Sequence, residues 1–195
     1  MPMPEKYPHR KSPAARASRS ETSRWADRAP VLRFLLRFGL LLGAFYAAVL
    51  LPWCDQAFYQ YLRLNALVSG AILRGLGQDA QVAKTSIHTV GFAISIHRGC
   101  DALEPAWFFC AAVLAFPAPW HRKRAVLLVG TALILLLNLV RIVSLFYIGL
   151  RAPAFFPTAH LELWPAAFLL VALLLWIGWI RSVPPGGKSH VPAAP

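Results

Sequence analysis

Four long runs of apolar residues alternate with polar segments along this 195-residue chain. The first run, 31–51, has 21 positions and as a helix reaches about 30 Å, the thickness of a bilayer's hydrocarbon core. The others are Ala102–Phe116, Ala125–Leu150 and Leu161–Ile180. This pattern predicts an all-α integral membrane helical bundle with about four transmembrane helices.

Residues 55–99, between the first two runs, have a mixed pattern. Ala57–Leu73 has apolar positions at helical spacing, but Gln60, Arg63 and Asn65 interrupt them. We therefore expect an interfacial helix here, with a fifth span as the alternative. Farther along, Phe92–Ile96 alternates apolar and polar residues, which is the period of a strand. With Val82–Thr89 before it, this segment predicts a small β-hairpin on the outer face.

Polar segments lie at both ends of the chain. Residues 1–30 are basic and rich in Pro and Ser, with no apolar period, which predicts a disordered tail held near anionic cytoplasmic lipid. Residues 182–195 form a second polar tail, also expected in the cytoplasm. The stretch 31–181 between them is expected to form one membrane-embedded domain.

Composition agrees with a membrane location: 57% of the residues are hydrophobic, 14% are charged, and the mean hydropathy is +0.52. The net charge of +12 would also suit nucleic acid, but its placement favours a role in topology. With both termini in the cytoplasm, fourteen Lys and Arg residues fall inside and six outside. The short loop Arg122–Arg124, with its three positive charges, supports this orientation independently of the N-terminal tail. We therefore expect the lipid bilayer, and no nucleic acid, as a partner.

Three residues with catalytic chemistry fall on one face of this predicted topology. Cys100 precedes the second span, Arg141 lies in the outer half of the third, and His160 precedes the fourth. A cation lowers the pKa of a nearby thiol, and a histidine can act as its general base and acid. Cys100 also lies at a helix start, where backbone amides favour an anion. Arg141 is the strongest single signal, because ionisable residues inside a span are costly and usually functional.

Neighbouring polar residues are expected to support these three. Asp101 follows Cys100 directly. Asn138 shares a helix face with Arg141 and is expected to orient the guanidinium or donate to an oxyanion. Glu104 is expected to pair with Arg141 or to contact substrate. The histidines show no metal-ligand spacing, so we expect no metal and no cofactor.

Structural alternatives remain for several of these side chains. Cys100 could form a disulfide with Cys54 at the same face, and Arg141 could form a structural ion pair with Glu104 or Glu162. Cys110, which lies among Phe and Ala residues, is expected only to pack.

The order of these motifs resembles the exosortase/archaeosortase family over residues 31–181, and the short length is similar to the compact exosortase H branch. A Cys opens one span, the sequence Asn138-Leu-Val-Arg141-Ile142 lies late in the next, and a His opens the last. After the Cys the common pattern is Cys-Ser/Asn-Gly-Leu, whereas this chain has Cys100-Asp101-Ala102-Leu103.

The resemblance implies a membrane-embedded cysteine transpeptidase or protease of the bacterial inner membrane. Cys100, Arg141 and His160 would form its catalytic triad, facing the periplasm. Its substrates would be exported or surface proteins with a C-terminal sorting signal: a short motif, a transmembrane helix and a basic end. Family members are associated with exopolysaccharide. The main alternative is a non-enzymatic scaffold or transporter component for polysaccharide export, and an intramembrane serine protease is disfavoured because no Gly-x-Ser-x-Gly-like element is present.

Overall fold

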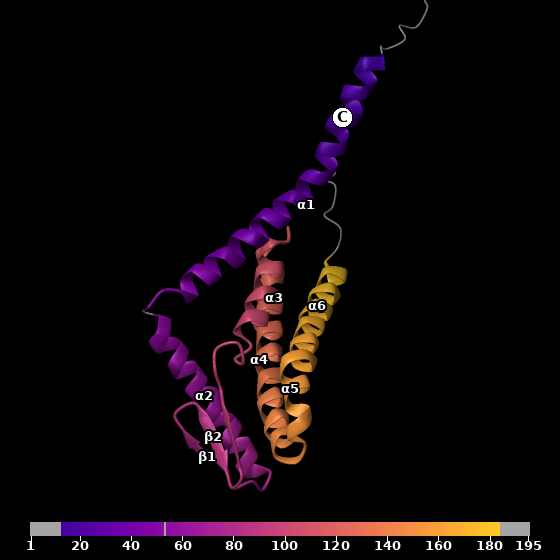
Figure 1. Ribbon diagram of the computed structural model, residues 1–195. Coiled ribbons are helices and arrows are strands. Elements are labelled where there is room, and N and C mark those ends of the chain that lie inside the picture. Colours follow the sequence, from indigo (N-terminus) through magenta and orange to yellow (C-terminus); the bar gives the residue numbers. More distant parts are fainter. Residues whose placement is uncertain (1–12, 53, 184–195) are drawn as a thin grey trace, which may run out of the picture.

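The computed structural model describes residues 13–52 and 54–183, with side chains from Arg28 onward. Helices make up most of it, and a small antiparallel sheet lies beside them (Figure 1). In chain order the elements are α1 (Pro13–Val49), α2 (Cys54–Gly75), β1 (Gln81–Ala83), β2 (Ser86–Thr89), β3 (Phe92–Ser95), α3 (Leu103–Ala115), α4 (Trp120–Arg151), η1 (Pro153–Phe155), α5 (Phe156–Thr158), η2 (Ala159–Leu163) and α6 (Trp164–Ser182).

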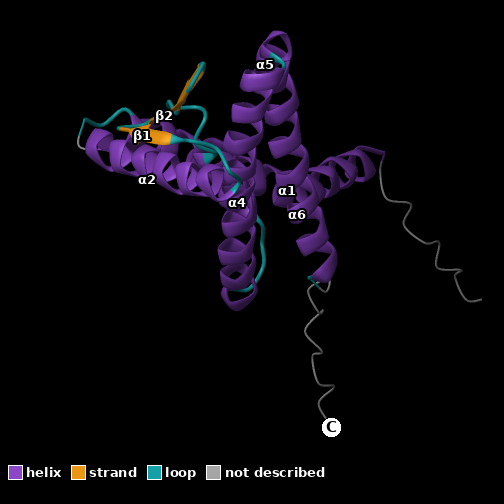
Figure 2. Ribbon diagram, turned by 90° about the horizontal axis from the view of Figure 1, so that it is seen from below, coloured by secondary structure: helices purple, strands orange, loops and turns teal. Residues whose placement is uncertain are grey.

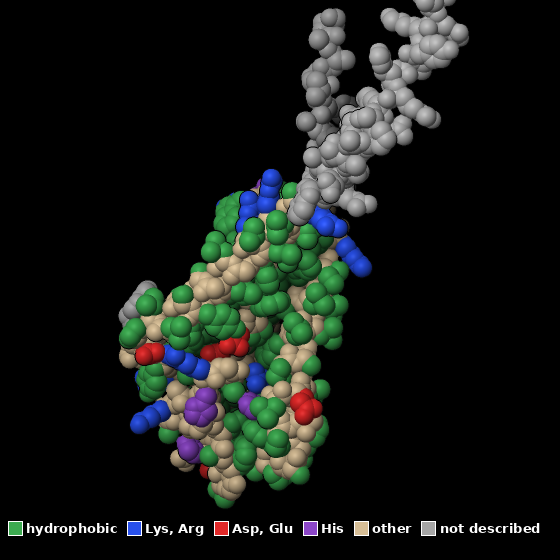
Figure 3. Space-filling view, turned by 45° about the horizontal axis from the view of Figure 1, so that its top comes forward, with side chains coloured by type: hydrophobic (Ala, Val, Ile, Leu, Met, Phe, Trp, Pro, Cys, Tyr) green, Lys and Arg blue, Asp and Glu red, His purple; other side chains and the backbone are tan. Residues whose placement is uncertain are grey.

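Three helical stretches are long and apolar enough to cross a membrane: Arg28–Val49, Trp120–Arg151 and Pro153–Ser182. They correspond to three of the four predicted apolar runs. The remaining run, Ala102–Phe116, forms α3, whose 13 residues span only about 20 Å, less than a hydrocarbon core. α3 packs against α1, α4 and α6. Most of the visible surface is apolar, and Lys and Arg side chains gather at the top of the view in Figure 3.

The first helix starts earlier than the apolar pattern indicated. α1 begins at Pro13, within the range 1–30 that we expected to be disordered, and continues through Pro30. The earlier part of that range, residues 1–12, lies outside the described residues, as do residues 184–195 of the expected C-terminal tail.

The segment between the first and second apolar runs is a helix followed by a sheet. α2 confirms the helix predicted over Ala57–Leu73. The predicted two-stranded hairpin is wrong in one respect: Val82–Thr89 is not one strand, because a turn at Lys84, with φ 58°, separates β1 from β2. The result is a three-stranded meander in the order β1-β2-β3. Figures 1 and 2 both show the sheet lying alongside α2.

The buried residues form two separate apolar cores. We call one the sheet core: it joins α2, the sheet and the C-terminal part of α4, through residues such as Leu73, Ile87 and Phe146. The other, the helix core, joins α3, α4 and α6, through residues such as Phe109 and Ile134. α4 contributes buried residues to both cores, and Trp164 of α6 packs against both, so these two helices hold the layers together.

Glycines on α4 allow a neighbour to approach closely in each layer. A Cβ at Gly130 would collide with the ring of Phe109 on α3, and one at Gly149 would collide with the ring of Phe92 on β3. Phe92 has little room to move, because its ring also packs against Phe146 and Phe156, with centroids 5.8 and 6.2 Å away. The contact between Gly149 and Phe92 therefore fixes β3 against α4.

We expect Gly149→Val to destabilise the sheet layer, because overpacking of this kind typically costs about 1–3 kcal/mol. Amide hydrogen exchange of the purified protein in detergent should show faster exchange across β2 and β3. Gly178→Val is the matched control, since a Cβ at this helical glycine meets nothing within 4 Å. Unchanged exchange in β3 of the Gly149→Val protein would contradict the role given to this contact.

Candidate active site

Cys100, Arg141 and His160 meet in the structure, although they are far apart in the sequence. Cys100 lies in the loop between β3 and α3, Arg141 on α4, and His160 on the π-helical turn η2. The Cys100 Sγ lies 3.4 Å from His160 Nε2 and 4.0 Å from Arg141 Nη2. A thiol, an imidazole and a guanidinium therefore converge on one point.

The Cys100 loop is held by its own backbone and by α2. Gly99 and Ala102 both have left-handed backbone, with φ values of 86° and 59°, and they turn the chain sharply on either side of Cys100. The buried Asp101 carboxylate accepts a hydrogen bond from the Leu103 N–H at the start of α3 (3.1 Å). The Tyr61 hydroxyl of α2 donates to the Asp101 carbonyl (2.6 Å). Asp101 thus shapes the loop that presents Cys100.

Burial dominates the electrostatics of the thiol. It raises the pKa of Cys100 above its usual value, and the nearby Asp101 carboxylate adds to the rise, while the Arg141 guanidinium opposes it. Burial likewise raises the pKa of Asp101, against the hydrogen bond from Leu103. The sequence predicts that a nearby cation lowers the pKa of Cys100, but it does not reveal that burial raises this pKa by more. The resting group is therefore a thiol, and a base must remove its proton before it can attack.

Arg141 is buried, with 5% of its surface exposed, near the Cys100 thiol and the Asp101 carboxylate. Its guanidinium carbon lies 5.6 Å from the centroid of the Phe168 ring on α6, within range of a cation–π contact. Its Nε has no hydrogen-bond partner among the described residues. This guanidinium can donate a hydrogen bond from Nε to a carbonyl oxygen or an oxyanion.

His160 is positioned by packing. Its ring stacks on Phe156, with centroids 5.6 Å apart and an interplanar angle of 14°. Nδ1 is buried and has no partner among the described residues, so within the described chain the stacking replaces the carboxylate that often orients a catalytic histidine. The π-helical turn Ala159–Leu163 rotates the chain just before α6, and such turns are frequent at functional sites.

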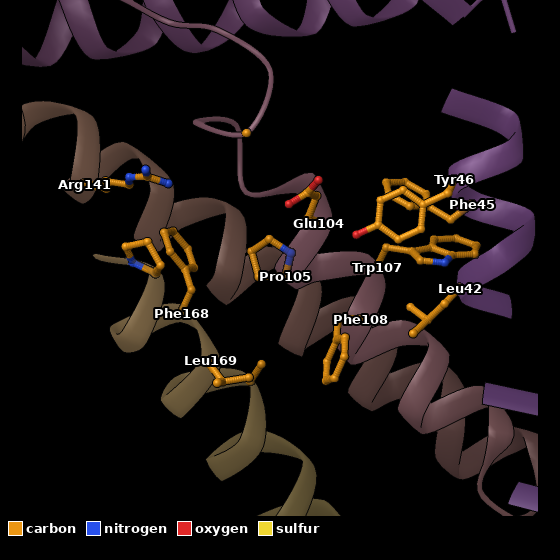
Figure 4. Close-up of a pocket in the computed structure, with 13 residues that line it drawn as sticks. Leu42, Phe45, Tyr46, Glu104, Pro105, Trp107, Phe108, Arg141, Phe168 and Leu169 are labelled. Carbon is orange, nitrogen blue, oxygen red and sulfur yellow. The ribbon is translucent and has the colours of Figure 1, made fainter. Parts of the chain in front are cut away.

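Two cavities meet at Arg141. The helix cavity, about 380 Å³, lies between α1, α3 and α6 and includes Glu104 in its lining. Figure 4 shows Arg141 at one side of it, the aromatic side chains Tyr46, Phe45 and Trp107 at the other, and Glu104 between them. The sheet cavity, about 420 Å³, lies between β3, α4 and η2, and both Cys100 and His160 line it. Arg141 lines both cavities.

Asn138 has a partner other than Arg141, and Glu104 shares a cavity with Arg141 without an ion pair between these two described residues. The Asn138 amide does not meet the guanidinium; it donates to the side-chain oxygen of Asn65 on α2 (3.2 Å), deep in the protein. Glu104 shares a cavity with Arg141, but among residues 28–52 and 54–183 the ion pair found is that of Arg98 with Asp55. Glu162 is exposed.

The other two cysteines, Cys54 and Cys110, lie outside the cluster of Cys100, His160 and Arg141. All three cysteines are free thiols, so the structure does not contain the alternative disulfide of Cys54 with Cys100. Cys110 contacts the Thr131 hydroxyl at 3.3 Å and packs against the helix core, as expected for a packing residue. The described part of the chain contains no cluster of metal-ligating side chains.

Four positioning residues escaped the sequence argument: Tyr61, Asn65, Phe156 and Phe168. Only Asn65 carries a signal in the sequence, as a polar residue within an apolar helix, and that pattern favours a helix at the membrane interface rather than a site residue. The aromatic three could not be distinguished from ordinary core residues.

The arrangement supports nucleophilic chemistry by a thiol with an imidazole as its base and a guanidinium as an electrostatic stabiliser. Comparisons of the chain with protein-family models, with curated proteins and with solved structures give no match.

The raised pKa of Cys100 predicts a pH dependence for its alkylation. The rate of modification by iodoacetamide should rise with pH, because only the thiolate reacts, and its midpoint should lie above that of N-acetylcysteine amide, a cysteine blocked at both ends, in the same buffer. Arg141→Gln should move the midpoint higher still, because the positive charge that favours the thiolate is lost. The measurement uses the Cys54→Ala/Cys110→Ala background. A midpoint below that of N-acetylcysteine amide would contradict the dominance of burial.

Proposed function

We propose that this chain is a membrane-embedded cysteine transpeptidase or protease that cleaves C-terminal sorting signals of exported proteins. The observation that carries the proposal is the convergence of Cys100, His160 and Arg141 from three separate elements. The resemblance of its motifs to the exosortase/archaeosortase family supports the substrate class.

The proposed reaction uses each of the three groups in turn. His160 Nε2 takes the proton of the Cys100 thiol, and the sulfur attacks the backbone carbonyl of the substrate. Arg141 stabilises the oxyanion, and the protonated His160 then gives its proton to the leaving amine as the C–N bond breaks. This leaves a thioester on Cys100, which water or a second amine resolves.

Helix length supports a position of the site at the outer edge of the bilayer. From Trp120 to Arg141, α4 rises by about 30 Å, which equals one hydrocarbon core. The remaining residues of α4, with the sheet and α2, would then stand outside the core, where water reaches the thioester. The short α3 would complete a four-span bundle by descending from the Cys100 loop, enclosed by α1, α4 and α6.

The positive loop Arg122–Arg124 favours the cytoplasm for the opposite end of α4, and so the periplasm for the site. The helix cavity would suit an apolar substrate helix, because its lining includes Leu42, Trp107 and Leu169. A non-enzymatic scaffold would instead employ Arg141 in an ion pair with Glu104. No such pair joins these two described residues, so the enzyme explains the guanidinium better.

Topology is tested by reporter fusions after Leu51, Trp120, Ala154 and Ser182, which we expect to report outside, inside, outside and inside. This pattern requires the region of α3 to cross the bilayer and places Cys100 and His160 on the same face. A fusion after Trp120 that reports outside would exclude the four-span arrangement and the site that depends on it.

The cysteine variants test the chemistry. Cys100→Ala and Cys100→Ser should both abolish cleavage of a co-expressed exported protein that ends in a short motif, an apolar helix and a basic segment, because a site tuned to a thiolate rarely accepts a hydroxyl. Cleavage is followed by the size shift of an epitope-tagged substrate.

Cys54→Ala and Cys110→Ala are the matched controls and should cleave normally, since neither thiol lies in the cluster of Cys100, His160 and Arg141. A trapped thioester should map to Cys100. Wild-type cleavage by Cys100→Ala, or a thioester that maps to Cys54, would refute the assignment.

A further inference from the structure

The outer edge of β3 carries backbone groups that the sheet does not use. β3 is an edge strand, because the sheet order is β1-β2-β3. Antiparallel residue pairs alternate between hydrogen-bonded and non-hydrogen-bonded positions. The Ile96 N–H donates to the Thr85 carbonyl (2.9 Å), which makes Ile96 a bonded position and, two residues earlier, Ile94 as well.

The residues between these bonded positions therefore turn their peptide groups away from β2. They are Ala93 and Ser95, and both residues are exposed. The hairpin from β2 to β3 gives the same register, since Thr89 and Phe92 close a two-residue loop and form a bonded pair. An edge of this kind is a template for another extended chain.

This edge lies along the sheet cavity. Every residue from Phe92 to His97 lines the cavity, without alternation. The face of a strand contributes every second residue, because side chains alternate between the two faces. A consecutive run shows that the cavity follows the edge of the strand. Cys100, Arg141 and His160 line the same cavity.

We propose that the substrate binds as an extended peptide that pairs with the free edge of β3 as a fourth strand and so brings its scissile carbonyl to Cys100. This inference rests on the proposed function and names how its substrate is held. The N–H and C=O groups of Ala93 and Ser95 supply the pairing, which depends on the peptide backbone and tolerates many sequences.

The walls of the cavity add a side-chain preference. Leu145 and Phe156 line it together with β3, so one of the two alternating sets of substrate side chains meets an apolar wall. The bound segment is thus extended, with apolar or small residues at every second position. A helical segment cannot use the edge, because its own backbone groups are already paired.

Thiol-directed probes can separate docking from reactivity. We would compare iodoacetamide, which needs no edge, with two peptide reagents: a bromoacetylated Ala-Leu-Ala-Leu amide and an acetyl-Ala-Leu-Ala-Leu chloromethyl ketone. These peptides extend from the electrophile in opposite chain directions, so one of them fits whichever direction the added strand takes. The rate of Cys100 modification is measured in the full chain with Cys54→Ala and Cys110→Ala.

The decisive variant is Ser95→Pro, which removes the outward N–H and leaves the bonds to β2 in place, because Ser95 is not a bonded position. It also removes the contact between the Ser95 and Ser86 hydroxyls (2.7 Å). Ser86→Ala is therefore the matched control: it loses the same contact but keeps the β3 edge.

Ser95→Pro should slow at least one peptide reagent by about three- to tenfold, the value of one hydrogen bond, and should leave iodoacetamide unaffected. Ser86→Ala should react with all three reagents as the parent does. Equal rates of both peptide reagents in the parent and in Ser95→Pro would overturn the edge-docking proposal while leaving the nucleophile intact.

A failure of the proposed nucleophile can be distinguished from a failure of edge docking. If iodoacetamide does not modify Cys100 at any pH, the proposed nucleophile fails. Hydrogen exchange of the Cys100→Ala protein then decides the docking alone. Excess acetyl-Ala-Leu-Ala-Leu amide should slow exchange of the Ala93 and Ser95 amides, and unchanged exchange at saturating peptide would overturn the proposal.

Discussion

A guanidinium buried in an apolar helix is costly unless its surroundings compensate the charge, and Arg141 imposes that constraint on this protein. It lies where the sheet core ends and the helix core begins, with an aromatic ring of α6 on one side and the Cys100 sulfur on the other. Compensation within the chain is incomplete, because Nε lacks a partner among the described residues. A group that arrives with negative charge, such as the oxyanion of a tetrahedral intermediate, would complete it.

The elements around this charge depart from regular geometry. The Cys100 loop has two left-handed residues within four positions, and the segment after α4 passes through 3₁₀, α and π turns before α6 begins. One irregular segment follows β3 and the other follows α4, and together they bring the Cys100 thiol and the His160 imidazole to the same point. Tyr61 of α2 holds the Cys100 loop from outside it, and Phe156, within the second irregular segment, stacks on the His160 ring. A small bundle can thus bring side chains from three separate segments together at one point without a larger scaffold.

The apolar periods of the sequence predict most of the helices, and the topology they imply predicts that Cys100, Arg141 and His160 share one face. The helical pattern of α2 was also readable. The turn at Lys84 was not, because a single left-handed residue leaves no trace in an alternating pattern. The partner of Asn138 was equally inaccessible, since helix periodicity identifies the face of α4 but not which helix covers it. The sign of the Cys100 pKa shift depends on burial, which only tertiary packing creates.

The sheet core also sets an order of assembly. Its strands end at Ser95, but Ile142, Leu145 and Phe146, on which they pack, belong to a helix that begins 25 residues later. During synthesis β1, β2 and β3 therefore emerge with α2 to pack against, but without the α4 side of their apolar core. His160 follows later still. The Cys100 thiol consequently meets the His160 imidazole only in the last stage of folding, after the helix that carries Arg141 is in place.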